Sequence, residues 1–338
     1  MKISIGSKII EGPWGGGNLF IINLKNYLIL KGHEVVHNLD DDDIDIILMT
    51  SPNHKAESSS FGYKDIYRYI KRIKNDSIVV HRINECDERK DTKNVNKFIL
   101  NANRVADATV FVSSWIENLY LKQGFNSENS KVILSGSDSK IFNPLNQSIW
   151  DKKSQLKIVT HHWGNNWNKG FEIYSELDNM ISNEELNLDI NFTYIGNVPN
   201  NFKFQKSTLL KPLSGKKLAN RLKEHHIYLT ASLFEPSGNH HIEGAQCGLP
   251  ILFINSGGLP EYCDGYGVMF ESGDFKNKLE YLIDNYDKYL MKVREYPRNS
   301  ETMSREYLNY FEELINSKNQ IIEKRKNLKL TRFPKFSL

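Results

Sequence analysis

Short apolar runs alternate with longer stretches in which apolar residues recur every three or four positions, along almost the whole chain. The short runs predict buried strands, and the longer stretches predict amphipathic helices. In the first half, strands are expected at KISIGS, EVVHNL, DIDIILMT, SIVVHRI, ATVFVSS and KVILSG, and helices at 18–31, 64–74, 93–106 and 114–123. This strand–helix alternation is typical of α/β proteins with a doubly wound parallel sheet.

The pattern breaks once, at 139–154, and then restarts with strands expected at LKIVTHHW, DINFTYIGN, TLLKPLS, HIYLTAS, PILFINSGG and GVMFES. A chain of 338 residues also exceeds the usual size of a single hydrophobic core. The sequence therefore predicts two Rossmann-like domains, at 1–145 and 155–300. A helix with a basic tail is expected to follow at 301–338.

Composition limits the classes of function. A net charge of +3 does not indicate a nucleic-acid partner, and the three cysteines form no CxxC pair, which favours a reducing compartment. No apolar stretch approaches the length of a membrane span. We expect a soluble, cytoplasmic protein. The basic residues from Lys318 onward are interpreted either as a solvated helix or as a site of peripheral membrane contact.

The stretch EPSGNHHIEGAQCGLP places Glu235 and Glu243 eight positions apart. Eight residues advance a helix by ~800°, two turns plus a large remainder, so the two carboxylates would not be aligned along one helix. We expect Glu235 to project from a loop and Glu243 to lie about one turn into a helix that Ser237 or Asn239 caps. Backbone N–H groups near 238–240 would then attract an anion between the two acids. The alternative is a capped helix with one exposed acid.

The longer segment EPSGNHHIEGAQCGLPILFINSGGLPEYC resembles the donor-binding signature of retaining GT-B glycosyltransferases, family 4 in particular (glycosyl transferases group 1). The resemblance implies two Rossmann-like domains that face each other across a cleft, with the C-terminal helix crossing back to the first. Residues 1–145 would form the acceptor side and 155–300 the nucleotide-sugar-binding domain. It also implies that Glu235 faces the transferred sugar and that Glu243 holds the ribose hydroxyls.

Two further segments fit this resemblance. NWNKGFEIY resembles the family's phosphate-binding segment, in which Lys169 would bind the diphosphate, although Gly164 stands where many members carry arginine. GPWGGGN resembles the glycine-rich first loop, where Gly16 and Gly17 would contact the donor. Phe20 stands where a dinucleotide fingerprint requires a small residue, which weakens the interpretation as a nicotinamide-dependent dehydrogenase.

The remaining site candidates follow from position. His81, at the end of a predicted strand, is either the family's first-domain histidine near the transferred sugar or a core histidine. Further donor-binding candidates are Ser237, Gly238, Asn239 and His240 on the turn, and Pro212 and Leu218 beside the nucleobase.

No metal or other cofactor is expected. Asp40 to Asp43 are interpreted as a solvated acidic loop. His161, His162, His240 and His241 lack the spacing of a metal site.

These features predict a metal-independent retaining glycosyltransferase acting in glycan or glycolipid biosynthesis. Its partners would be a nucleotide-sugar donor and a glycan, lipid-linked or small-molecule acceptor. The alternatives are a nucleotide-sugar-binding protein of this kind without turnover, and an epimerase or hydrolase of the same fold.

Overall fold

The computed structural model describes residues 1–10, 16–126 and 128–327. The chain forms two compact units. Unit 1 comprises residues 1–11, 17–134 and 301–338, and unit 2 comprises residues 12–16 and 135–300. The chain therefore leaves unit 1, builds unit 2 and returns to unit 1. The expected boundary at 145 lies about ten residues beyond the observed one.

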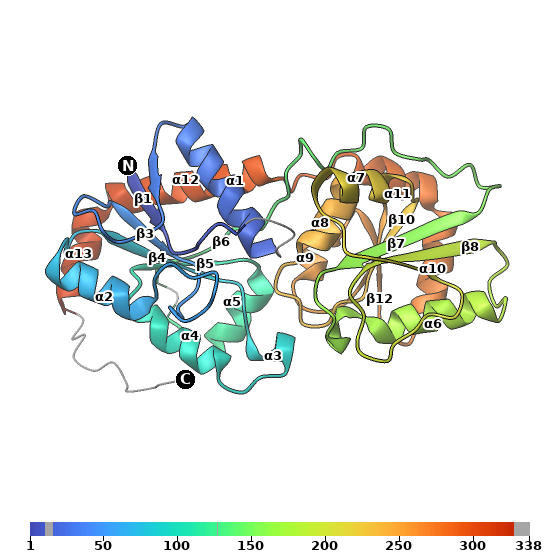
Figure 1. The fold of residues 1–338 in the computed structure, drawn as a ribbon, viewed down its shortest axis with the longest axis horizontal. Helices are drawn as coiled ribbons and strands as arrows, with labels where there is room; N and C mark the ends of the chain where they lie inside the picture. Colours follow the sequence, from blue (N-terminus) through green and yellow to red (C-terminus); the bar gives the residue numbers. More distant parts are fainter. Residues whose placement is uncertain (11–15, 127, 328–338) are drawn as a thin grey trace. The chain divides into compact units, whose positions relative to one another are not determined.

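Unit 1 contains a parallel sheet with strand order β2-β1-β3-β4-β5-β6 (Figure 1). The strands are β1 (Lys2–Ile5), β2 (Glu34–Val36), β3 (Ile46–Met49), β4 (Ile78–Ile83), β5 (Ala108–Phe111) and β6 (Ser130–Val132). The helices are α1 (Gly16–Leu30), α2 (Tyr63–Arg72), α3 (Asp87–Lys90), α4 (Val95–Asn103), α5 (Ser114–Leu121), α12 (Ser300–Asn316) and α13 (Lys318–Asn327). The strands β3, β4 and β5 are buried at every position, as expected for parallel strands covered on both faces.

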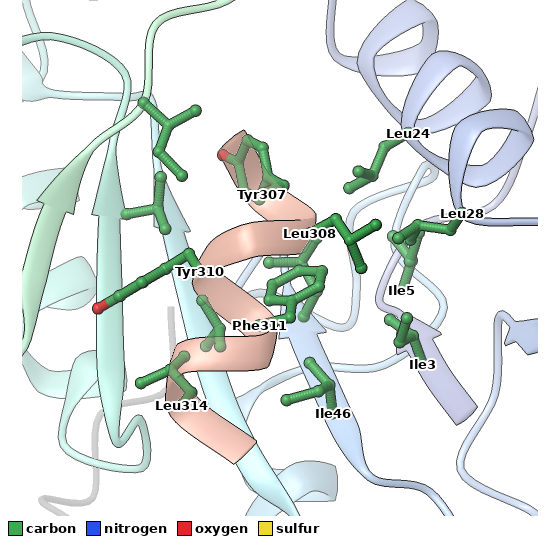
Figure 2. Packing of buried hydrophobic residues seen from close by; sticks show 14 of the residues in the cluster. Ile3, Ile5, Leu24, Leu28, Ile46, Tyr307, Leu308, Tyr310, Phe311 and Leu314 are labelled. Carbon is green, nitrogen blue, oxygen red and sulfur yellow. The ribbon is translucent and has the colours of Figure 1, made fainter. Parts of the chain in front are cut away.

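Helix α12 supplies part of the core of unit 1. Tyr307, Phe311 and Leu314 recur at helical spacing and are buried in the cluster that also contains Ile3 of β1 and Ile46 of β3. Figure 2 shows side chains of α12 over the strands that carry Ile3 and Ile46, with Leu24 and Leu28 of α1 beside them. Helix α12 and the strands β1 and β3 thus share one core although they are far apart in the sequence.

Polar contacts hold helix α13 to the same unit. The Arg325 guanidinium donates to the Asp107 carboxylate and to the carbonyls of Asn75 and Ser77. Lys318 pairs with Asp76 at 2.6 Å. Lys318 and Arg325, two of the basic residues interpreted either as a solvated helix or as a site of membrane contact, thus form ion pairs within unit 1.

Unit 2 contains a second parallel sheet, with strand order β12-β11-β10-β7-β8-β9 (Figure 1). The strands are β7 (Leu156–His162), β8 (Ile190–Gly196), β9 (Thr208–Leu210), β10 (Ile227–Thr230), β11 (Ile251–Ile254) and β12 (Gly267–Phe270). The helices are η1 (Trp167–Lys169), α6 (Phe171–Ser182), α7 (Gly215–Lys223), α8 (Asn239–Gln246), α9 (Leu259–Cys263), α10 (Phe275–Asp284) and α11 (Tyr286–Val293).

Every predicted strand is present, and both sheets are parallel, as predicted. The short helices α3 and α9 were not predicted. Across the described residues, no helix is both long enough and apolar enough to cross a membrane. Asp41 and Asp43 of the acidic loop form ion pairs with Lys2, each at 2.9 Å.

Candidate active site

The strands β7 and β10 are neighbours in unit 2, with Ile158 opposite Ile227 and Val159 opposite Tyr228. Because both strands run in the same direction, their carboxyl ends meet at one edge of the sheet. The segments that follow them, 163–170 and 231–243, therefore lie at that edge. Ligands of open parallel sheets bind at this edge.

Lys169 and Glu235 form a buried ion pair here, with 2.5 Å between Nζ and Oε2. Only 9% of Lys169 and 2% of Glu235 are exposed. Their segments are also joined through the backbone, since the Leu233 N–H donates to the Asn168 carbonyl at 2.7 Å. Glu235 lies on a loop, as expected, and Lys169 holds its carboxylate there.

Two glycines of the sequence pattern shape this loop. Gly170 has φ +101°, and a Cβ there would lie 2.6 Å from the Cβ of Ala231. Gly257 has φ +62°, and a Cβ there would lie 2.5 Å from the Glu235 carbonyl oxygen. The next residue, Gly258, donates its N–H to that oxygen at 2.8 Å. The glycines after Lys169 and in GGLPE therefore allow the backbone to pack closely around Glu235.

The second acid, Glu243, lies in α8, is 4% exposed, and accepts a hydrogen bond from His161 Nε2 at 2.8 Å. The His161 ring also contacts the Tyr228 hydroxyl, at 3.1 Å from Nδ1. Sequence reasoning considered His161 only as a metal ligand and missed this contact. The available signal was a histidine pair at the end of a predicted strand, next to the loop that leads to Lys169.

Three further histidines surround the site and are uncharged at neutral pH. Burial lowers the pKa of His162 and His240 well below 6.5, and lowers the pKa of His241 to about 3. His162 contacts the Tyr174 hydroxyl at 2.7 Å and His240 contacts Thr230 Oγ1 at 2.8 Å. Despite this concentration of imidazoles, the described residues contain no group of three ligands placed to hold a metal ion.

The start of α8 differs from the prediction. Gly238, not Ser237 or Asn239, is the N-cap residue, and no side chain caps the helix. Ser237 instead donates to Ser135 Oγ at 2.8 Å and accepts from the Tyr262 hydroxyl at 3.0 Å. The first backbone N–H groups of α8 are therefore not used by a capping side chain.

The other predicted residues belong to different segments of the chain. His81 is buried in β4 of unit 1, where Nδ1 contacts Asn103 Oδ1 at 2.8 Å, the environment of a core histidine. Gly16 and Gly17 are exposed at the start of α1, and a Cβ at Gly16 would lie 3.1 Å from the Asn239 side chain at the start of α8. The rest of the glycine-rich loop, 12–15, lies outside the described residues. Pro212 is half-buried before α7, and Leu218 lies on the buried face of that helix.

No family model and no curated protein matches this sequence. Solved structures do match. A glycosyltransferase from Rickettsia africae ESF-5 is 14% identical, with a TM-score of 0.66 over 93% of this chain and 98% of that one. The catalytic domain of Arabidopsis thaliana starch synthase IV, bound to ADP and acarbose, is 13% identical, with a TM-score of 0.67 over 93% and 99%. Anabaena HepE in complex with UDP-glucose is 14% identical, with a TM-score of 0.61 over 97% and 100%.

The chain has the GT-B fold. In this GT-B protein, the segment predicted to be donor-binding forms the buried loop and helix that carry Glu235 and Glu243. One lysine, two carboxylates and a helix start without a capping side chain lie along one sheet edge. Such a set can bind hydroxyls and an anion together.

Proposed function

We propose that the protein is a glycosyltransferase that moves a sugar from a nucleotide-sugar to an acceptor hydroxyl, with retention at the anomeric carbon and without a metal. The observation that supports this most is the buried cluster of Lys169, Glu235 and Glu243 at the carboxyl edge of the unit 2 sheet. The similarity to glycosyltransferase structures, one bound to UDP-glucose, agrees with it.

Each group has a role in this proposal. Glu243 accepts hydrogen bonds from the ribose hydroxyls of the nucleotide. Lys169 and the first N–H groups of α8 bind the diphosphate, because a cation and a helix N-terminus both attract an anion. Glu235 accepts hydrogen bonds from the transferred sugar. The donor must then compete for Lys169, which Glu235 holds in the free protein.

The reaction breaks the bond between the anomeric carbon and the diphosphate oxygen and forms a bond from that carbon to the acceptor oxygen. The acceptor attacks from the face that the diphosphate leaves, and its proton passes to the departing phosphate oxygen. The leaving group gains negative charge as the bond breaks. Lys169 and the α8 amides stabilise that charge in a preorganised way, so no strong protein base is needed.

The first test is a thermal-shift panel of UDP, GDP, ADP and CMP and their sugars. A ligand present at about 100 times its dissociation constant adds about 2.7 kcal/mol to stability. We expect one nucleotide to raise the melting temperature of the wild type and of Glu280→Ala, an exposed change on α10, but not of Glu243→Ala. If no nucleotide raises the melting temperature of the wild type, the proposal is wrong.

Turnover is tested with the nucleotide-sugar identified in that panel, with and without EDTA. Transfer with a retained anomeric configuration by NMR, unaffected by EDTA, supports the proposal. Loss of transfer in EDTA that Mg²⁺ restores contradicts metal independence.

A second candidate is a nucleotide-sugar-binding protein without turnover. The glycine at 164, where the resembling family often has arginine, favours it, because only Lys169 then serves the diphosphate from that segment. Binding with neither transfer nor release of free sugar would support this candidate. Free sugar formed without an acceptor would instead indicate a hydrolase or epimerase.

A further inference from the structure

The His161 ring is held on several sides. Nε2 lies 2.8 Å from Glu243 Oε2, and Nδ1 lies 3.1 Å from the Tyr228 hydroxyl. The ring packs edge-to-face against Tyr228 and His240, with ring centroids 5.7 and 6.4 Å away. Its orientation is therefore fixed by packing as well as by hydrogen bonds.

These contacts also determine which ring nitrogen carries the proton. The backbone N–H of His161 donates to the Tyr228 hydroxyl oxygen at 3.2 Å, which leaves the hydroxyl hydrogen to donate to Nδ1. That hydrogen is retained at neutral pH, because burial raises the pKa of Tyr228 well above 10. Nδ1 is then the acceptor, and Nε2 carries the proton that is donated to Glu243.

Glu243 is thereby held by one oxygen only. Oε2 accepts from His161, while Oε1 accepts no hydrogen bond from any residue in the described part of the chain. A carboxylate oxygen that the protein leaves without a donor is available to accept a hydrogen bond from a ligand hydroxyl.

We propose that His161 is a positioning residue: Tyr228 sets its tautomer, and it turns Glu243 so that Oε1 accepts the hydroxyls of the nucleotide's ribose. The inference rests on the proposed function for the identity of the ligand. It goes beyond that function by assigning ribose selectivity to a histidine that does not touch the nucleotide.

The test compares binding of the nucleoside diphosphate found in the thermal-shift panel with binding of its 2′-deoxy and 3′-deoxy analogues, by calorimetry. His161→Leu removes the donor to Glu243, and His161→Gln retains an amide N–H donor. The matched control is His226→Gln, because His226 is also a buried histidine in unit 2, bonded to the Lys157 N–H at the start of β7.

We expect the wild type to prefer the ribonucleotide over at least one deoxy analogue by about tenfold or more, the usual contribution of a hydrogen bond to a charged group. In His161→Leu the preference should fall to about twofold or less. His161→Gln should retain most of it, and His226→Gln all of it. A purely structural role for His161 predicts a different result: weaker binding of all three nucleotides with the preference unchanged, which overturns the inference.

The tautomer is tested without a ligand. The ¹⁵N chemical shifts of the His161 ring should show a protonated Nε2 and an unprotonated Nδ1, and the opposite pattern refutes the mechanism. A wild type that binds the nucleotide but does not discriminate against either deoxy analogue overturns the inference and leaves the proposed function intact. A wild type that binds no nucleotide overturns the proposed function and the ribose assignment together. The ¹⁵N chemical shifts of the His161 ring would still show whether Nε2 donates to Glu243.

Discussion

Replacing Arg325 by alanine should destabilise unit 1, although the residue lies close to the end of the described chain. Its guanidinium donates to Asp107 Oδ1 from Nε at 2.8 Å and to the same carboxylate from Nη2. It also donates to the carbonyls of Asn75 at 2.7 Å and Ser77 at 2.6 Å. The side chains of Arg325 and Asp107 are only 12% and 5% exposed.

The size of the stability loss depends on the contacts that Asp107 keeps in Arg325→Ala. Asp107 keeps one described donor, the Val79 N–H at 2.7 Å, and its negative charge stays buried. Removing one partner of a buried ion pair costs about 3–5 kcal/mol. Water can approach the partly exposed arginine position, so the lower value of about 3 kcal/mol applies. This corresponds to about 100-fold in the equilibrium between folded and unfolded unit 1.

Hydrogen exchange of the β4 and β5 amides measures this effect, because these strands are buried in unit 1. The amides that exchange through global opening should exchange about 100-fold faster in Arg325→Ala. The control is Lys324→Ala, whose exposed contact with Glu128 is 3.5 Å long and should change exchange by no more than about twofold. Equal effects of the two substitutions would refute the reasoning.

Two other predictions concern unit 1. Phe311→Ala should lower the free energy of unfolding, measured with denaturant, by about 3–5 kcal/mol, because the fully buried ring fills the core in Figure 2. The control Ile29→Ala, at a position 50% exposed, should lower it little. Similar losses of stability in the two variants would contradict the prediction. Burial lowers the pKa of His81 to about 4, so between pH 6.5 and about 4 the unfolded chain binds a proton that the folded chain does not. The free energy of unfolding should therefore fall as pH falls through this range, by up to about 1.4 kcal/mol per pH unit from this group. His81→Gln should remove that part of the dependence of stability on pH. An unchanged pH dependence in this variant would show that His81 does not titrate in this way.

The sequence predicted the elements of both units because each leaves a local signal. DIDIILMT contains four consecutive buried positions, 46–49, and such an apolar run is visible without knowledge of the neighbouring strands. The signal is weaker in shorter elements. Helix α3 has four residues and α9 has five, too few for a helical period to appear.

The contacts of the candidate site were less predictable because they depend on strand order. Lys169 meets Glu235 only because β10 pairs with β7, and the two residues are 66 positions apart. The same limit explains the wrong prediction of the α8 cap. Ser237 has the side chain of a good cap, but it bonds to Ser135, which is 102 positions away. Propensity describes what a residue can do locally, and a distant partner can override it.

The division of unit 1 between the two ends of the described chain affects the order of events during synthesis. Residues 135–300 emerge from the ribosome as a continuous unit, whereas unit 1 lacks α12 and α13 until the residues after unit 2 have been made. Domains usually fold in the order in which they are made. Here unit 2, the later of the two to begin, is the first to be complete. Until α12 arrives, the nascent chain exposes the apolar surface around Ile3 and Ile46 that Phe311 later covers, and a chain terminated near 300 would keep it exposed.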